Sequence, residues 1–141
     1  MRDQRLECHT LLMKVAWKVI RKTRKKLNEM GFGWHQFLTM KSIYPGEAVT
    51  LSEISSRISK ENSNVTTLIN FLEEKGIVRR VDDRKDRRVV RVELTENGEK
   101  IRERAIAEHE DYIERLYRDL SQANIEDFIE VMTMMDEKIQ A

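Results

Sequence analysis

Two short alternating segments around a highly charged turn constrain the fold of this chain most strongly. In residues 89–94 apolar and polar side chains alternate from Val90 onward, and residues 77–81 form a second short run rich in Ile and Val. Alternation of this kind is typical of a half-buried β-strand and does not fit a helix. The turn between the two runs carries Asp82, Asp83, Arg84, Lys85, Asp86, Arg87 and Arg88. We therefore predict one β-hairpin with a charged tip.

The rest of the chain has the periodicity of helices. With one Pro and five Gly in 141 residues, long helices are permitted and an all-β fold is disfavoured. Helices are predicted at residues 5–30, 34–44, 51–58, 62–75, 95–120 and from 121 onward. Their expected boundary signals are a capping box of Thr50 with Glu53, glycine stops at Gly31 and Gly76, and N-caps at Thr95 and Ser121. The fold class is therefore mainly α with a small β-hairpin (α+β).

Length and composition narrow the class of protein. A chain of 141 residues is expected to form a single domain, residues 1–141. Its apolar runs are too short to span a membrane, and its N-terminus lacks the apolar core of a signal peptide. One cysteine cannot form an internal disulfide, which fits a reducing compartment. We predict a cytoplasmic protein with no membrane partner.

The net charge of +1 conceals an uneven distribution along the chain. Residues 1–30 carry nine Lys and Arg against three Asp and Glu, and residues 57–91 carry ten against six. Residues 92–141 carry six basic and fourteen acidic side chains. The basic middle segment is a candidate nucleic-acid surface, and the acidic C-terminal segment is not.

The segments 51–58 and 62–75 follow each other closely, as in a helix-turn-helix. The second helix of such a motif can enter the major groove of DNA. Its apolar face is predicted to consist of Val65, Leu68, Ile69 and Leu72. Small polar residues, which are poor helix formers, are left on its outer side and near its start. We predict that they contact DNA bases: Asn62, Ser63, Asn64, Thr66, Thr67 and Asn70.

With these elements in place, the sequence resembles the MarR family of winged helix-turn-helix regulators. The most specific part of the resemblance is residues 72–100, where Asp83, Asp86, Arg87, Arg88, Leu94, Thr95 and Gly98 fall on the family pattern. Residues 35–43 and 51–58 also match by position. At the start of the recognition helix the chain departs from the pattern, with Glu61 where Ser is frequent and Thr67 where Arg is frequent. This departure concerns the operator sequence and not the class.

The resemblance implies a homodimer that binds double-stranded DNA. It implies dimerisation helices at residues 1–30 and 100–141, and a winged helix-turn-helix lobe at residues 33–98. It also implies that Arg88 reaches the minor groove and that Asp86 supports the wing arginines by ion pairing. The apolar surplus of the C-terminal helices fits burial against a second copy.

The charged hairpin tip has a simpler alternative explanation. It could be a solvated loop whose cations pair locally with its own aspartates. Surface ion pairs contribute only about 0–1 kcal/mol, so stability gives little reason for such a cluster. Because the predicted helix-turn-helix lies directly upstream, we predict DNA contacts for Arg84, Lys85, Arg87 and Arg88. Without the neighbouring hairpin, the polar face of the helix at residues 62–75 would be interpreted as an ordinary solvent-exposed face.

Cys8 and the three histidines are further candidate sites. Some relatives implied by the resemblance sense peroxides through a cysteine in the first helix, and Cys8 lies near a helix start beside Arg5 and His9. Residues 1–43 contain no Tyr partner for such a sensor, so a redox-sensing regulator is the alternative reading. The three histidines lie on three predicted helices without ligand spacing, so we predict no metal site and no cofactor.

A small-molecule effector is also implied by the resemblance. Its candidate pocket would be lined by Trp17, Trp34, Phe37 and Met40, although aromatic and Met side chains at helical spacing are more often core. The leading hypothesis is a sequence-specific transcription regulator, a repressor released from a pseudo-palindromic operator by an effector. No nucleophile elbow, phosphate loop or dinucleotide motif is present, so an enzyme is not expected. The other alternative is an interaction module that binds an acidic protein.

Overall fold

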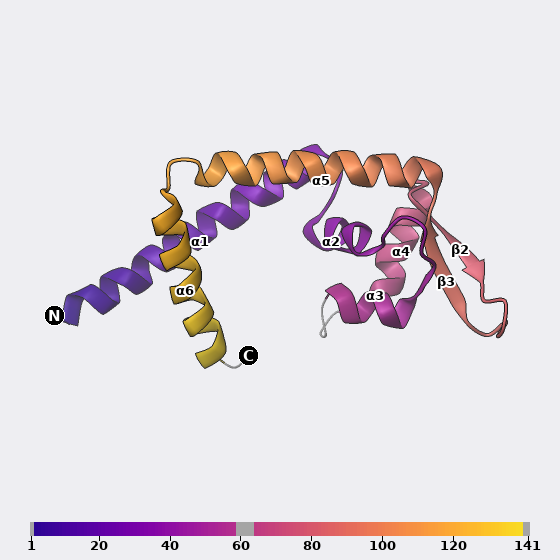
Figure 1. Cartoon of the computed structure of the whole chain (residues 1–141), viewed down its shortest axis with the longest axis horizontal. Coiled ribbons are helices and arrows are strands. Elements are labelled where there is room, and N and C mark those ends of the chain that lie inside the picture. The colour runs from indigo at the N-terminus through magenta and orange to yellow at the C-terminus, as the bar shows by residue number, and fades with distance from the viewer. Residues whose placement is uncertain (1, 59–63, 140–141) are drawn as a thin grey trace. The chain divides into compact units, whose positions relative to one another are not determined.

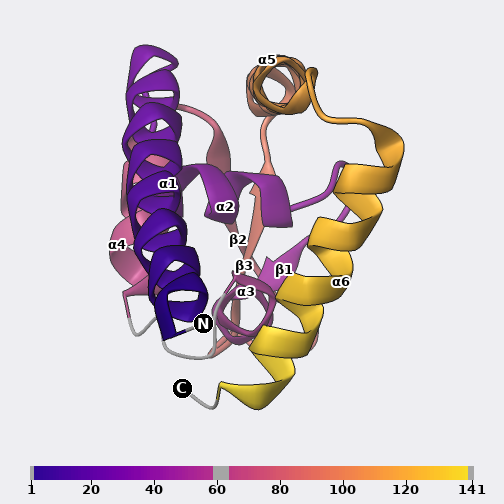
Figure 2. The same ribbon diagram turned by 90° about the vertical axis from the view of Figure 1, so that its left-hand side faces the viewer.

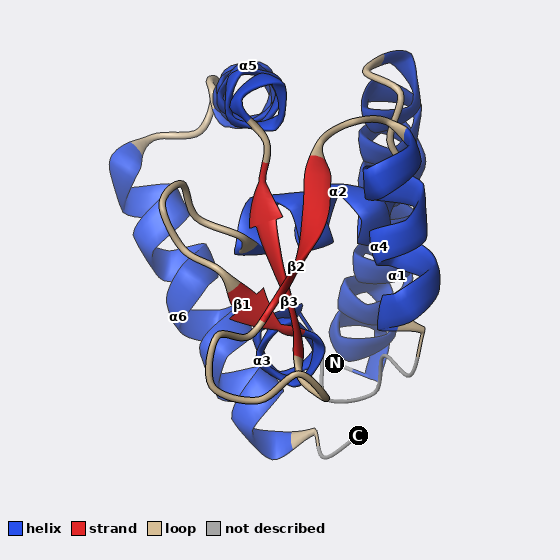
Figure 3. Cartoon of the chain, turned by 90° about the vertical axis from the view of Figure 1, so that its right-hand side faces the viewer, coloured by secondary structure: helices blue, strands red, loops and turns tan. Residues whose placement is uncertain are grey.

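The computed structural model describes residues 2–58 and 64–139, and the chain divides after Ile106 into two compact units (Figures 1 and 3). The helices and strands follow in the order α1 (Arg2–Glu29), α2 (Trp34–Ser42), β1 (Val49–Thr50), α3 (Leu51–Ile58), α4 (Val65–Glu74), β2 (Val78–Asp82), β3 (Val90–Leu94), α5 (Glu96–Tyr117) and α6 (Gln122–Lys138). The boundary between the units falls within α5. The mainly helical fold with a small sheet is as predicted, whereas the single domain over residues 1–141 stays a prediction.

The predicted hairpin is present, within one residue of its expected bounds. β2 and β3 pair in antiparallel fashion, with Val78 opposite Leu94 and Asp82 opposite Val90. A third strand, β1, pairs with the other edge of β3 and places Val49 opposite Val92, so the sheet order is β1-β3-β2. β1 was not predicted because a strand of two residues is too short to show an alternating pattern.

The hydrophobic core of the first unit joins this sheet to α2, α3 and α4. α2 packs against both α3 and α4, and α4 packs against β2. Figure 2 shows α2 above α3. α4 contributes Val65, Ile69 and Leu72 to the core at helical spacing, as predicted, while Leu68 is only half-buried. Because these residues face the core, the opposite side of α4 faces solvent.

The C-terminal end of α2 differs from the prediction. The helix ends at Ser42, and Ile43 takes an extended backbone (φ −98°, ψ 116°) that carries its side chain fully into the core. Tyr44, the last residue of the helix predicted at residues 34–44, lies outside α2 and is 56% exposed. The physical reason is Pro45, because a proline disfavours the helical conformation in the residue before it.

The predicted helix caps are formed. At the start of α3 the backbone N–H of Glu53 donates to Thr50 Oγ1 at 3.1 Å, and the N–H of Thr50 donates to Glu53 Oε2 at 3.2 Å. At α5 the N–H of Gly98 donates to Thr95 Oγ1 at 2.9 Å. At α6 the N–H of Asn124 donates to Ser121 Oγ at 3.1 Å.

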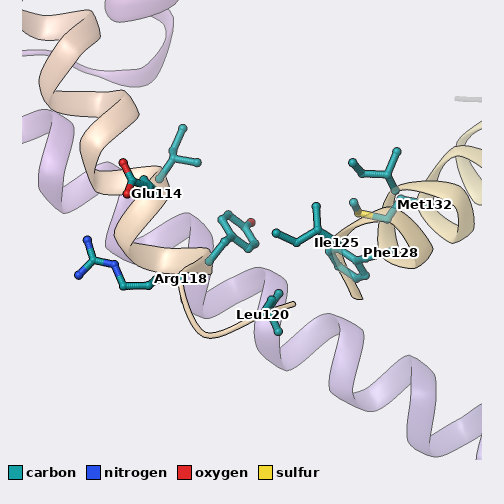
Figure 4. A pocket seen from close by; sticks show the side chains of 9 residues that line it. Glu114, Arg118, Leu120, Ile125, Phe128 and Met132 are labelled. Atoms are coloured by element: carbon teal, nitrogen blue, oxygen red, sulfur yellow. The ribbon is translucent and has the colours of Figure 1, made fainter. Parts of the chain in front are cut away.

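Apolar side chains remain exposed on the terminal helices. In α1, Leu27 lies in the core, while Leu6, Met13 and Ile20, which precede it at seven-residue spacing, are at least 42% exposed. In the second unit, α6 has no buried residue within its described length. An apolar groove of about 530 Å³ lies in that unit (Figure 4), lined by Ile113, Tyr117, Leu120, Ile125, Phe128 and Met132 among others.

None of the helices in the described ranges is long and apolar enough to cross a bilayer.

Candidate nucleic-acid interface

The outer face of α4 is a row of exposed polar side chains: Asn64, Thr66, Thr67 and Asn70. Asn64 is the N-cap residue of the helix, and its Oδ1 accepts a hydrogen bond from Thr67 Oγ1 at 3.1 Å. The predicted base contacts Asn62 and Ser63 lie outside the described residues. The four described members can therefore donate and accept hydrogen bonds along one side of a helix.

The wing tip, residues 83–89, is a closed turn at the end of the hairpin. The N–H of Asp83 donates to the carbonyl of Val89 at 3.1 Å, and the N–H of Val89 donates to the carbonyl of Asp86 at 3.0 Å. The Asp86 carboxylate accepts hydrogen bonds from the backbone N–H of Arg88 at 3.0 Å and from its Nε at 3.3 Å. The Arg88 side chain nevertheless stays 92% exposed.

Most cations of the wing tip are not paired with its aspartates. Arg84, Lys85 and Arg87 are exposed, and within the described part of the chain they form no ion pair. Asp83 is engaged by Arg91 instead. The explanation of the cluster by local charge pairing therefore applies to Arg88 alone, and three cations face solvent.

Asp83 and Arg91 hold the base of the wing, a role that the sequence reasoning did not assign. Asp83 Oδ1 accepts a hydrogen bond from the N–H of Lys85 at 2.8 Å, and Arg91 donates from Nη1 to the carbonyl of Ala48 at 3.1 Å. The hydrogen bond from Lys85, together with that from Arg91, lowers the pKa of the Asp83 carboxyl. The turn-capping role of Asp83 could have been predicted from the sequence, because an aspartate side chain in a turn commonly accepts a hydrogen bond from the backbone N–H two residues later, here that of Lys85. The hydrogen bond from Arg91 to the carbonyl of Ala48 could not be predicted from neighbouring residues, because the two lie 43 residues apart in the sequence.

A second unpredicted contact connects the wing to the outer face of α4. Arg80 of β2 donates from Nη2 to Asn70 Oδ1 at 2.7 Å and pairs through Nη1 with Glu73 Oε1. Its neighbour Arg79 faces the other side of the strand and pairs with Glu93 of β3 at 2.6 Å. The amide oxygen of Asn70 is thus engaged by the wing, and the contact of Asn70 with a base stays a prediction.

A cluster around Tyr44 holds α3 against the end of α2. Arg57 of α3 forms a two-fold ion pair with Glu47 and donates to the carbonyl of Ser42 at 2.7 Å. The guanidinium groups of Arg57 and Arg102 lie 5.7 Å and 5.1 Å from the centre of the Tyr44 ring. The hydrogen bond between Arg57 and Glu47 lowers the pKa of the carboxyl and raises the pKa of the guanidinium.

The four residues predicted to line an effector pocket do not share one environment. Phe37 and Met40 are fully buried and pack in the core, and their part in a pocket stays a prediction. Trp17 and Trp34 are 58% and 41% exposed. Cys8, the candidate redox residue, is exposed on α1. In the described ranges no three His, Cys, Asp or Glu side chains are grouped to hold a metal ion.

The sequence matches the MarR family over residues 33–90, the segment that contains α2, α3, α4 and the wing. The HTH-type transcriptional regulator YsmB of Bacillus subtilis is 29% identical over 114 residues, which cover 81% of this chain and 78% of YsmB.

Solved structures share the fold over nearly the whole chain. A MarR-like transcription regulator from Bacillus cereus superposes with a TM-score of 0.78 at 16% identity and covers 97% of this chain and 99% of its own. A variant of MepR from Staphylococcus aureus, bound to an oligodeoxyribonucleotide, superposes with a TM-score of 0.62 at 22% identity. It covers 94% of this chain and 97% of its own. The hairpin beside α4 thus corresponds to the wing of a winged helix-turn-helix.

Proposed function

The chain belongs to the MarR family of winged helix-turn-helix transcription regulators, and we propose that it binds a pseudo-palindromic DNA operator as a homodimer. Transcription regulators of this family are not enzymes. The proposal concerns which residues meet DNA, how two copies assemble, and how binding is released.

The observation that carries the proposal is the pairing of two surfaces in the first unit. The outer face of α4 offers neutral hydrogen-bonding groups, and the wing tip offers three cations without an ion pair among the described residues. The contact of Arg80 with Asn70 places the wing directly beside that face. In DNA, the base edges in the major groove offer hydrogen-bonding groups that complement the face of α4, and the flanking phosphates offer negative charges that complement the wing tip.

We assign base contacts to Asn64, Thr66, Thr67 and Asn70, and extend this assignment to Asn62 and Ser63 on the sequence pattern alone. Arg84, Lys85 and Arg87 are assigned to phosphates, where a mobile cation contributes affinity without reading sequence. Arg88 is assigned to the adjacent minor groove, with Asp86 limiting its range of orientations.

Exposed apolar side chains support the assignment of a homodimer. In α1, Leu6 and Met13 are 54% and 59% exposed, and in α6, Phe128 and Ile129 are 44% and 55% exposed. Large side chains of this kind, repeated along both terminal helices, fit burial against a second copy. Two recognition helices related by a two-fold axis would read half-sites about one helical turn apart.

Repression and release complete the proposal. A dimer on an operator that overlaps a promoter would exclude the polymerase. An effector that binds better to a dimer with a different spacing of recognition helices would lower DNA affinity by that difference. The exposed Trp17 and Trp34 are the described side chains of the predicted pocket that such a ligand could reach.

Selection of bound duplexes from a random pool tests the proposed function. We expect enrichment of an inverted repeat with half-sites about 10 base pairs apart, centre to centre. In gel shifts on the selected duplex, Asn70→Ala is expected to weaken binding and Arg104→Ala is not, because Arg104 is exposed on α5, a helix that belongs to neither surface. Recovery of random sequence, or equal binding by both variants, would contradict the proposal.

A further inference from the structure

The amide of Asn70 has a defined orientation on the outer face of α4. Arg80 donates from Nη2 to Asn70 Oδ1 at 2.7 Å. A guanidinium has only donors, so the amide oxygen, and not the nitrogen, must face it. The Nδ2 group of Asn70 forms no hydrogen bond with other described residues, and the side chain is exposed. The free group of this amide is therefore a donor.

Arg80 is itself held in place by the protein. Its Nη1 pairs with Oε1 of Glu73, which lies three residues after Asn70 on the same side of α4. Its backbone is fixed in β2 opposite the fully buried Val92. The Arg80 side chain is 29% exposed, compared with 63% for Arg79 on the opposite face of the strand. Both side-chain partners of Arg80 thus lie on α4, and the carboxylate of Glu73 neutralises the charge of Arg80.

The orientation of the amide limits which bases it can read. In the major groove, guanine offers O6 and N7 as acceptors, adenine offers N7 and thymine offers O4, whereas cytosine offers the N4 donor. An outward amide N–H donor can pair with the first three and meets only another donor on cytosine. Because Arg80 already restricts the Asn70 side chain, less rotational freedom is lost on binding.

We propose that Arg80 is a specificity-determining positioning residue, which orients the Asn70 amide so that one position of the operator half-site excludes cytosine. This inference rests on the proposed function, since it requires Asn70 to meet a base edge. It assigns sequence discrimination to a wing residue that does not itself touch the base.

The test compares duplex selection by the full-length wild type, Arg80→Met and Arg79→Met. Asn70→Ala first identifies the base pair concerned, as the position where preference is lost. Arg79→Met is the matched control, because it removes the same charge from the adjacent residue of β2 on the other face. We expect Arg80→Met to reduce discrimination against cytosine at that position by about five-fold or more, the lower end for a good base contact. Arg79→Met is expected to keep it.

Two results would overturn the inference while leaving the proposed function intact. In one, Arg80→Met keeps the wild-type preference at every position. In the other, it weakens binding to all sequences equally and lowers the slope of log affinity against log salt by about 0.9, as loss of a phosphate contact does. A wild type that enriches no motif would instead overturn the proposed function, and this inference with it.

A second variant decides the question if Arg80→Met does not fold. Asn70→Asp changes one exposed side chain and keeps an oxygen for Arg80, but turns the outward donor into an acceptor. We expect its preference at the same position to move to cytosine, whose N4 group donates to carboxylates. An unchanged preference in Asn70→Asp would overturn the inference independently.

Discussion

Arg91 of β3 donates a hydrogen bond from Nε to Oδ2 of Asp83 at 2.9 Å, which ties the first residue of the wing tip to the middle strand of the sheet. The same guanidinium reaches the carbonyl of Ala48, directly before β1. The Asp83 side chain, 14% exposed, therefore lies between the turn that it caps and the sheet. The hydrogen bonds of Arg91 with Asp83 and Ala48 thus fix the end of the hairpin from which the cations of the wing tip extend.

This arrangement predicts an acid-dependent loss of stability in the wing. The pKa of Asp83 is lowered in the folded protein, so its bonds stabilise the fold above the ordinary aspartate pKa of about 3.9. That contribution decreases as the pH falls below about 4 and is lost below the folded-state pKa. Asp83→Asn is therefore expected to be less stable than the wild type at pH 7 and equally stable at the lowest pH. Urea unfolding at several pH values measures this.

The control for this experiment is Asp82→Asn. Asp82 is the adjacent carboxylate, is exposed, and forms no ion pair within the described ranges. Its variant should follow the wild type at every pH. A gap between Asp83→Asn and the wild type that stays constant from pH 7 to pH 3 would show that folding does not lower the pKa of Asp83, and would contradict this prediction.

Gly98 is a packing requirement at the start of α5. A Cβ atom at this position would lie 1.9 Å from the carbonyl oxygen of Ile77, which is backbone and cannot rotate away. Gly98→Ala is therefore expected to displace α5 from β2 and to cost about 1–3 kcal/mol or more in the free energy of unfolding. Gly33→Ala is the matched control, since its nearest contact is the flexible Gln36 side chain at 3.4 Å. Equal stability of the two variants would show that the junction adapts.

The apolar groove of the second unit predicts the oligomeric state. Phe128 lines this groove and is 44% exposed. In a homodimer formed by the terminal helices, Phe128→Glu would place a charge in a buried interface and should yield monomers in sedimentation equilibrium. Glu130→Gln, on the same helix and exposed, should leave the dimer intact. A wild type that sediments as a monomer at tens of micromolar would contradict the assignment of a homodimer.

Salt dependence separates contacts to phosphates from contacts to bases. Each phosphate neutralised on duplex DNA adds about 0.9 to the slope of log affinity against log salt. Arg87→Ala removes an exposed cation of the wing tip that forms no ion pair among the described residues, and should lower this slope by about that amount. Arg104→Ala should leave the slope unchanged. A slope unaffected by Arg87→Ala would remove the wing tip from the phosphate contacts.

The elements that depend on local pattern could be predicted from the sequence. The hairpin follows from alternation in residues 90–94, and the capping box at Thr50 and Glu53 follows from side-chain reach over one helical turn. The outer face of α4 followed from helical spacing, because Val65, Ile69 and Leu72 fix its inner side. Periods of two and 3.6 residues carry this information within short windows.

Contacts between distant segments could not be predicted in this way. Arg80 and Asn70 are ten residues apart, and Arg91 and Ala48 are 43 apart. An arginine in a strand can pair with several acidic or carbonyl groups, and only the packed backbone selects one. The exposure of Tyr44 has a local cause instead, because the proline that follows disfavours a helical conformation at Tyr44.

Tethered DNA cleavage tests most directly the claim that α4 and the wing bind one face of a duplex. Thr66→Cys and Arg88→Cys, each made with Cys8→Ser, would carry an iron chelate that cleaves the nearest nucleotides of the selected operator. We expect cleavage centred on the major groove of each half-site for position 66, and on the adjacent minor groove, about five base pairs away, for position 88. Cleavage from only one of the two positions would contradict the account. Cleavage sites that do not lie in a major groove and the minor groove next to it would also contradict it.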